Sequence, residues 1–266
     1  MNDFAHRFPA GFSSRQSGSA RRPAPLPVVE PWEGLLLVDK PSGMTSHDVV
    51  DAIRRHFGFK KVGHGGTLDP MATGLLVILL GRGTKLSNRI IASDKTYEGA
   101  MKLGMTTDTE DVDGQVLSEA DWSGVTRARV EEEISRRQGD LMQTPPMVSA
   151  VKRQGVPLYK LARKGLTVER EPRLIHVYEF RLKAFELPRA HFLLRCTKGT
   201  YVRTLCADIG KALGCGAFLE SLRRTRSGGL TLDAATPLDD ILRMDAEQLA
   251  KRVRPLHDVP LEGPPA

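Results

Sequence analysis

The chain has 266 residues, of which 40% are hydrophobic, so it can bury a core of ordinary size in one large domain or two small ones. No apolar run approaches the roughly 20 residues of a membrane-spanning helix, and we therefore expect no membrane span. The formal net charge of +7 and the isoelectric point of about 9.4 favour an anionic partner, either a nucleic acid or a phosphorylated metabolite.

Cysteines and histidines give no sign of a metal or redox site. The three cysteines, Cys196, Cys206 and Cys215, are an odd number at spacings that match no zinc or redox motif. None of the seven histidines forms a pair at metal-ligand spacing. We expect reduced, buried thiols, a cytoplasmic location and no metal.

Residues 1–31 are rich in Ser, Arg and Pro and show no hydrophobic periodicity. Asp3 is the only acidic residue before Glu30. This composition predicts a disordered basic tail, or a solvated arm that touches RNA weakly. An organellar transit peptide has a similar composition but would carry an amphipathic stripe, which is missing here.

The first predicted elements are a strand, a turn and a helix. Residues 34–38 form a short apolar run, and residues 39–43 contain the Pro and Gly of a turn. Thr45 and Asp48 have the spacing of a capping box, and Gly58 can end the helix that follows. The helix should run between these two signals.

Asp69 lies in a loop between glycines and a proline. Gly65 and Gly66 permit positive φ and close backbone approach, and Pro70 disfavours a helical conformation at Asp69. Such a loop can hold a carboxylate rigidly beside the apolar run at 75–80, although spacing alone favours an Asp that only stabilises a turn. The neighbouring histidine can likewise be an ordinary turn residue.

The remaining predicted elements indicate an α+β domain. Residues 81–85 only superficially resemble a phosphate-binding loop, because the four residues required between the first Gly and the Gly-Lys pair are absent. Residues 95–103 alternate as a strand does and place Tyr97 on the same face as core residues. Further along the chain we expect a helix at 126–138, strands at 174–185 and 190–197, and a helix at 200–213. Several strands adjoin without an intervening helix, which favours a mixed sheet.

Two groups of residues could bind an anion. Lys198, Tyr201 and Arg203 lie at the start of the last predicted helix, where anions are favoured, although a capped helix with a solvated arginine explains them equally well. Basic residues also gather in two clusters, one made of Lys152, Arg153, Lys160, Arg163, Lys164, Arg170 and Arg173, and the other of Arg223, Arg224 and Arg226. A run of charge is usually a solvated face, but Tyr159 within the first cluster fits a mobile arm that grips a phosphate backbone.

Five motifs together resemble the bacterial TruB family of tRNA pseudouridine-55 synthases. They occur in the family's order and span about residues 34–235: GLLLVDKPSGMTSHDVV, GHGGTLDPMATGLL, DKTYEGAMKLGMTTDTEDVDG, TPPMVSAVKRQGVPLYKLARKG and KGTYVRTLCADIG. The resemblance implies an α+β pseudouridine-synthase catalytic fold with a central mixed, mainly antiparallel sheet, flanked by helices and carrying an RNA-binding cleft.

The resemblance also implies a function. Members of this family isomerise the T-loop uridine of tRNA to pseudouridine, by breaking and re-forming the glycosidic bond of a flipped-out base without a cofactor or metal. We therefore expect a monomer whose partner is tRNA, bound at the T-arm and elbow. The alternative is a tRNA-binding folding chaperone in which catalysis is secondary or lost.

Matching motifs also carry over site residues. Asp69 corresponds to the essential carboxylate, and Tyr97 to an aromatic that stacks on the target base and assists proton removal from its C5. Tyr201 and Arg203 resemble a pair that lines the pocket, with Arg203 facing the carboxylate. A fixed carboxylate can stabilise or trap the oxocarbenium-like charge that develops when the bond from C1′ to N1 breaks. The RNA-contacting residues of the family correspond to Lys40, Pro41, His64, Asp111 and Leu222, and to Arg163 and Lys164 in a mobile, RNA-clasping insertion at about 144–173.

The expected catalytic domain spans residues 32–240 and is followed by a short segment at 241–266. Family members usually carry a PUA or PUA-like domain after the catalytic domain, and here the sequence stops near where it would begin. Reliance on the catalytic domain alone and a truncated sequence both remain open. Gly65 stands where many members have threonine, a difference that leaves the Asp69 motif intact.

Overall fold

The computed structural model describes residues 32–149, 152–153, 155–158, 161, 165–166 and 168–258. The predicted tail at 1–31 therefore lies outside the described residues. Within the described residues, ten strands form one sheet: β1 (Gly34–Lys40), β2 (Val62–His64), β3 (Thr73–Leu80), β4 (Lys95–Leu103), β7 (Gly139–Gln143), β10 (Arg173–Glu186), β11 (Arg189–Cys196), β12 (Ala217–Ser227), β13 (Leu230–Thr231) and β14 (Thr236–Pro237).

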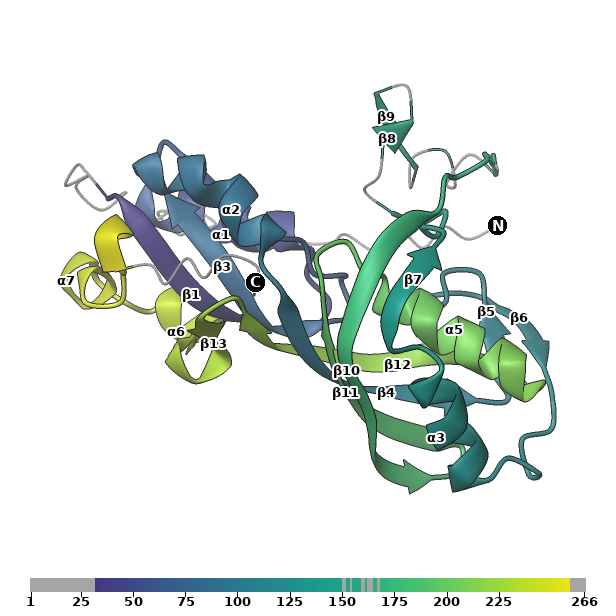
Figure 1. Cartoon of the computed structure of the whole chain (residues 1–266). Helices are drawn as coiled ribbons and strands as arrows, with labels where there is room; N and C mark the ends of the chain where they lie inside the picture. The colour runs from purple at the N-terminus through teal and green to yellow at the C-terminus, as the bar shows by residue number, and fades with distance from the viewer. Residues whose placement is uncertain are drawn as a thin grey trace, which may run out of the picture.

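Helices and two small strand pairs complete the described part of the chain (Figure 1). The helices are α1 (Ser46–Phe57), α2 (Ser87–Ala92), α3 (Arg127–Ser135), α5 (Val202–Leu213), α6 (Leu238–Ile241) and α7 (Ala246–Ala250), with 3-10 turns η1 (Gly81–Leu86), η2 (Leu232–Ala234) and η3 (Leu256–Asp258). The strand pairs are β5 (Met105–Thr107) with β6 (Val116–Glu119), and β8 (Lys152–Arg153) with β9 (Val156–Pro157). None of the described helices is long and apolar enough to cross a membrane.

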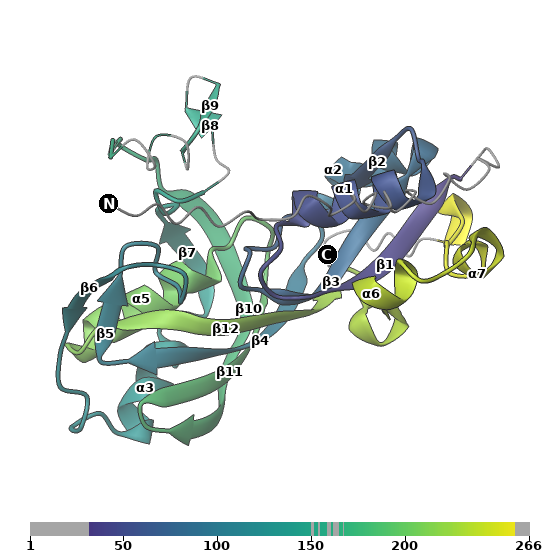
Figure 2. The ribbon, with the colours of Figure 1, turned by 180° about the vertical axis from the view of Figure 1, so that it is seen from behind.

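The sheet has two halves that share one strand. Its hydrogen-bonded strands follow the order β14, β1, β3, β12, β4, β11, β10, β7, with β2 beside β3 and β13 beside β12. β12 runs parallel to β3 and antiparallel to β4, so a strand from late in the chain separates two early ones (Figures 1 and 2). The only other parallel pair among the described strands joins β1 to β14. The predicted mixed, mainly antiparallel α+β fold is confirmed.

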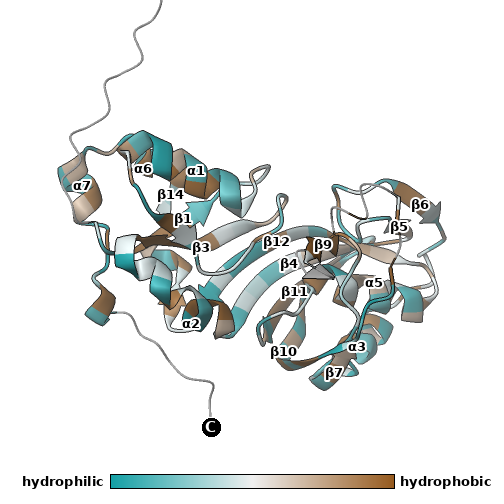
Figure 3. Cartoon of the chain, turned by 90° about the horizontal axis from the view of Figure 1, so that it is seen from above, coloured by the Kyte–Doolittle hydropathy of each residue, from teal (hydrophilic) through white to brown (hydrophobic). Residues whose placement is uncertain are grey.

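Alternate residues of β1 and β3 face two different cores. In β1, Leu36 and Val38 belong to the larger core, which also holds apolar residues of α1, α3 and α5. Leu35 and Leu37 face the opposite side and pack in a smaller core with Ile90 of α2. The helices α1 and α2 thus lie at one end of the sheet, and α3 and α5 at the other (Figure 1). In Figure 3, hydrophilic colour covers much of the strands around β4 and β12 between these two groups.

Several predicted elements lie where expected. Thr45 accepts a hydrogen bond from the backbone of Asp48, whose side chain bonds back to Thr45, and Gly58 ends the helix in the left-handed conformation. The three cysteines are free and buried. The helix expected at 126–138 is shorter, because Gly139 already begins β7. The segment at 217–227, which carries the second basic cluster, is a central strand that the sequence did not predict.

Candidate active site

The turn after β1 holds the loop that carries Asp69. The fully buried Lys40 ammonium donates to the carbonyls of Pro41 (2.8 Å), Met44 (2.6 Å) and, across the chain, Pro70 (3.1 Å). Burial lowers the pKa of Lys40 to about 8. The backbone N–H of Gly43 donates to the same Pro70 carbonyl at 2.9 Å. Lys40 therefore ties the turn to the residue directly after Asp69, and Pro41 beside it is exposed.

The start of α1 fixes the other side of Asp69. The Ser46 hydroxyl accepts from the backbone N–H of Leu68 at 2.8 Å and donates to the Leu68 carbonyl at 3.2 Å. Both neighbours of Asp69 are thus held by hydrogen bonds to β1 and α1, which limits the freedom of the carboxylate between them.

Arg203, in the first turn of α5, connects Asp69 to two other segments. Its Nη2 donates to Asp69 Oδ1 at 3.3 Å and to the Val148 carbonyl at 2.8 Å. Its Nη1 donates to the Thr109 carbonyl at 3.2 Å and lies 3.5 Å from Asp111 Oδ2. The Arg203 side chain is only 4% exposed, whereas that of Asp69 is 33% exposed. The alternative of a solvated arginine is wrong, and the carboxylate is the accessible member of the pair.

Asp111 lies in a loop that docks on β12. The backbone N–H of Leu219 donates to the Glu110 carbonyl at 3.0 Å, and that of Val112 donates to the Leu219 carbonyl at 3.0 Å. The Thr109 hydroxyl donates to Asp111 Oδ1. Burial raises the pKa of the Asp111 carboxyl. Asp111 and Asp69 both face the Arg203 guanidinium, and Asp111 is therefore the less hydrated of the two carboxyl groups.

The two predicted aromatic residues approach the pair from different elements. Tyr97 on β4 is buried with the larger core, and in the register of the sheet it pairs with Leu194 on one side and Arg224 on the other. Burial raises the pKa of Tyr97 to about 12, so its phenol stays protonated at neutral pH. Tyr201 caps α5, and its ring centroid lies 6.0 Å from the guanidinium carbon of Arg203.

Gln143 on β7 holds Tyr201 and was missed by the sequence analysis. Its Oε1 accepts from the backbone N–H of Tyr201 at 2.8 Å, and its Nε2 donates to the Tyr201 carbonyl at 3.0 Å. This buried side chain thus holds both backbone groups of the residue before α5, whose own side chain makes no capping bond. No local signal could reveal it, because the two residues lie 58 positions apart.

The remaining predicted residues are less closely connected to the pair. His64 on β2 accepts a 3.4 Å bond at Nδ1 from the backbone N–H of Gly66, which places the proton of the neutral ring on Nε2, and burial lowers its pKa. Leu222 is buried on β12 beside Gly99 of β4. Arg163 and Lys164 lie outside the described residues.

One member of the second basic cluster is not a solvated residue. Arg224 is 2% exposed and donates to backbone carbonyls around the Asp69 loop and to the Tyr97 side chain, whereas Arg226 is exposed as expected. The expectation of a solvated face is therefore wrong for Arg224, because tertiary contacts rather than water satisfy its donors.

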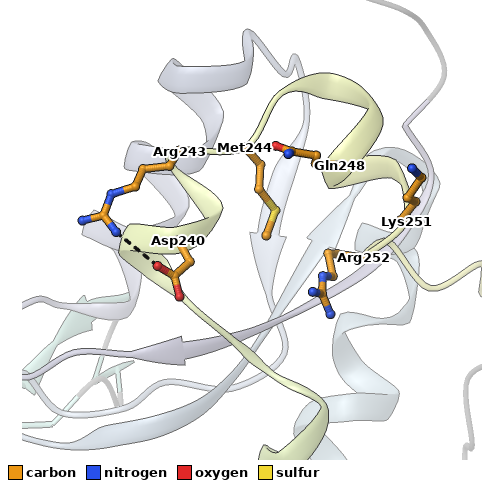
Figure 4. A pocket seen from close by; sticks show the side chains of 6 residues that line it. All are labelled: Asp240, Arg243, Met244, Gln248, Lys251 and Arg252. Carbon is orange, nitrogen blue, oxygen red and sulfur yellow. Dashed lines mark hydrogen bonds and ion pairs between the residues drawn. The ribbon is translucent and has the colours of Figure 1, made fainter.

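Two further hollows of the described surface are lined by neither Asp69 nor Arg203. One, of about 540 Å³, is lined by Asp240, Arg243, Met244, Gln248, Lys251 and Arg252, and Asp240 is paired with Arg243 at 3.2 Å (Figure 4). A second, of about 630 Å³, lies among α3, α5, β7 and β10 and includes Gln143. In the described part of the chain, no cluster of three or more His, Cys, Asp or Glu side chains could hold a metal ion.

Comparisons with known proteins agree with this architecture. Residues 54–202 match the family described as TruB family pseudouridylate synthase (N terminal domain), and residues 203–259 match the tRNA pseudouridylate synthase B C-terminal domain. The chain is 51% identical over 225 residues to the tRNA pseudouridine synthase B of Opitutus terrae, covering 85% of this chain and 93% of that protein. It is 53% identical over 211 residues to that of Geotalea uraniireducens, covering 79% and 68% respectively.

Solved structures show the same fold. The crystal structure of a Cbf5-Nop10-Gar1 complex aligns with a TM-score of 0.66 and 29% identity, over 84% of this chain and 60% of that one. The structure of an H/ACA RNP bound to a substrate RNA containing 2'-deoxyuridine aligns with a TM-score of 0.63 and 26% identity, over 84% and 59%. Together with the sequence matches, these likenesses establish that the chain belongs to the TruB family of pseudouridylate synthases.

Proposed function

We propose that this protein is a tRNA pseudouridine synthase that isomerises the T-loop uridine without a cofactor. The observation that carries the proposal is the pair formed by the accessible Asp69 carboxylate and the buried Arg203 guanidinium, 3.3 Å apart. It occurs in a chain about half identical to two relatives that are named tRNA pseudouridine synthase B.

The pair suits chemistry at a glycosidic bond. Cleavage between C1′ and N1 develops oxocarbenium-like charge on the ribose, which a fixed carboxylate stabilises or traps. The detached uracil then turns, C5 bonds to C1′, C5 loses its proton and N1 gains one. We assign Asp69 as the carboxylate that acts on the sugar or the base, and Arg203 as the residue that holds this carboxylate in place.

Tyr97 is the group we assign to the base. A buried aromatic ring offers a stacking surface for a uridine that has left its own stack. Because its phenol stays protonated, Tyr97 can take the C5 proton only while it releases its own. Tyr201 lines the same pocket in this proposal.

RNA contacts form the second part of the proposal. We assign these contacts to Lys40, Pro41, His64, Asp111 and Leu222, and to Arg163 and Lys164 in an insertion at about 144–173. The partner is the T-arm and elbow of a tRNA, bound by a cytoplasmic monomer whose catalytic domain spans 32–240. The net charge of +7 supports an anionic partner of this kind.

Single-turnover conversion of uridine to pseudouridine in an unmodified T-arm transcript tests the function. We expect modification at the T-loop uridine with the wild-type protein, none with Asp69→Asn, and binding of the transcript within a few-fold for both. Asp69→Asn keeps the size of a side chain that makes a single bond in the described structure, so the fold should persist. Binding without conversion by the wild-type protein would contradict the enzymatic proposal and favour a tRNA-binding chaperone.

The salt dependence of binding tests the insertion. Neutralising Arg163 and Lys164 together should weaken binding. It should also reduce the slope of log K for tRNA binding against log salt concentration by the amount expected for the loss of about two phosphate contacts. A matched control neutralises Arg127, the first residue of α3, and Arg136, directly after its end, two exposed arginines that pair with glutamates of that helix. An unchanged slope in the first variant would remove the insertion from the interface.

A further inference from the structure

Arg224 lies where the two halves of the sheet meet. In the register of β12 it is opposite Gly74 of β3 on one side and Tyr97 of β4 on the other. The strands approach so closely here that a Cβ on Gly74 would lie 2.4 Å from the Arg224 carbonyl oxygen. Both halves of the sheet therefore fix the backbone position of Arg224, from which its side chain extends.

The donors of Arg224 reach both sides of the Asp69 loop. Nε donates to the Leu75 carbonyl at 2.7 Å, Nη1 to the Thr67 carbonyl at 3.3 Å and Nη2 to the Gly66 carbonyl at 3.2 Å. Gly66 and Thr67 precede Asp69, and Leu75 follows it. One planar side chain thus fastens the entry and the exit of the loop to β12.

The charge of Arg224 is buried without a carboxylate partner among the described residues. A buried charge is costly, and an apolar side chain of similar size would pack here without that cost. In Lys40, His64 and Lys95, burial is the main cause of a lowered pKa and the Arg224 charge adds to it. In Tyr97, burial raises the pKa, and the charge of Arg224 and its hydrogen bond to the Tyr97 side chain both oppose the rise.

We propose that Arg224 is a positioning residue for the reaction, which keeps the Asp69 loop in the one geometry that brings its carboxylate to the substrate. The inference rests on the proposed function. Arg224 touches neither Asp69 nor an exposed surface, and it acts through the loop backbone and through its hydrogen bond to Tyr97. Lys40 and Ser46 hold the residues next to Asp69 independently, so loss of Arg224 should leave a folded protein with a displaced carboxylate.

The test separates chemistry from binding. We expect Arg224→Met and Arg224→Lys to lower the single-turnover rate at saturating protein by about 100-fold, the effect of a displacement on the order of 1 Å. The Kd for the transcript should stay within a few-fold. Lysine keeps the charge but cannot reach three carbonyls in a plane, so it should not restore the rate. Arg226→Met is the matched control, because Arg226 is exposed and its Nε donates to the Gly228 carbonyl.

A titration of His64 by NMR adds a readout that loss of stability alone would not move. Its pKa should rise in Arg224→Met, which removes a nearby positive charge, and stay unchanged in Arg224→Lys. If Arg224→Met does not fold, Arg224→Lys tests the positioning role by the same comparison of the single-turnover rate with the Kd for the transcript. A folded variant with the wild-type rate overturns the positioning role alone, whereas a wild-type protein that binds without converting overturns the proposed function as well.

Discussion

Arg203 and Asp69 lie 134 positions apart in the chain, yet Nη2 of the arginine is 3.3 Å from Oδ1 of the aspartate. The same nitrogen donates to the Val148 carbonyl at 2.8 Å, in the segment where the predicted RNA-clasping insertion begins. A displacement of that segment would therefore move or release the Arg203 nitrogen that donates to the Asp69 carboxylate.

Replacing Arg203 by lysine should separate charge from geometry. A single ammonium cannot serve two carbonyls and two carboxylates at once, so we expect a loss of about 100-fold in the single-turnover rate. The free energy of unfolding should fall by about 2 kcal/mol, because buried acceptors lose charged donors. In the control Arg189→Lys, whose partner Glu220 is at the surface, urea unfolding should show a loss below about 1 kcal/mol. Full activity of Arg203→Lys would contradict the need for the planar group.

Gln143 can be tested by its two bonds to Tyr201. Gln143→Met keeps the length of the side chain but leaves the N–H of Tyr201 without its partner and leaves its C=O only the bond from the N–H of Leu205, so stability should fall by about 2 kcal/mol in urea. Gln138→Met removes a single bond from the N–H of Phe180 and should cost about half as much. Equal losses would show that the start of α5 does not depend on Gln143.

The buried ammonium of Lys40 should make stability depend on pH. Its pKa is about 8 in the folded protein and near 10.5 in the unfolded chain, so between these values the unfolded chain binds more protons and stability rises with pH. This group contributes up to about 1.4 kcal/mol per pH unit. Urea unfolding from pH 8 to 10 should show a smaller slope of stability against pH in Lys40→Met than in wild type. Lys251→Met, at an exposed position directly after α7, should keep the wild-type slope.

Two glycines with positive φ should respond differently to alanine. At Gly74 (φ +97) a Cβ would overlap the backbone of Arg224, so Gly74→Ala should cost about 3 kcal/mol from strain and overlap together. At Gly43 (φ +84) a Cβ would meet open space, and the cost should be about 1 kcal/mol from the conformation alone. Thermal or urea unfolding of both variants gives the comparison, and similar losses would mean that the contact between β3 and β12 relaxes easily.

Elements determined by neighbours in sequence could be predicted from the sequence. The capping box at Thr45 and the closing Gly58 define α1, and the alternation at 95–103 defines β4, because these signals lie within the elements themselves. The resemblance to the TruB family supplied the roles of the site residues, which stay predictions. The spacing around Asp69 alone favoured a simple turn.

Elements that depend on distant partners could not be predicted. β12 carries three arginines and one glutamate between its apolar residues, a pattern typical of a solvated segment. Arg224 is buried there because carbonyls from residues 66–75 and the Tyr97 side chain accept its hydrogen bonds. Arg203 likewise finds its acceptors at Thr109, Asp111 and Val148, so no local pattern distinguishes it from an exposed arginine.

The position of β12 also sets the order in which the molecule can be completed during synthesis. β3 and β4 leave the ribosome more than a hundred residues before the strand that fills the space between them. Until residues 217–227 are available, the facing edges of β3 and β4 lack their partner, and unpaired edges invite pairing with other chains. Arg224 arrives with the same strand, so the sheet closes and the Asp69 loop gains its bonds to Arg224 in one late event, and until then a nascent chain lacks these bonds.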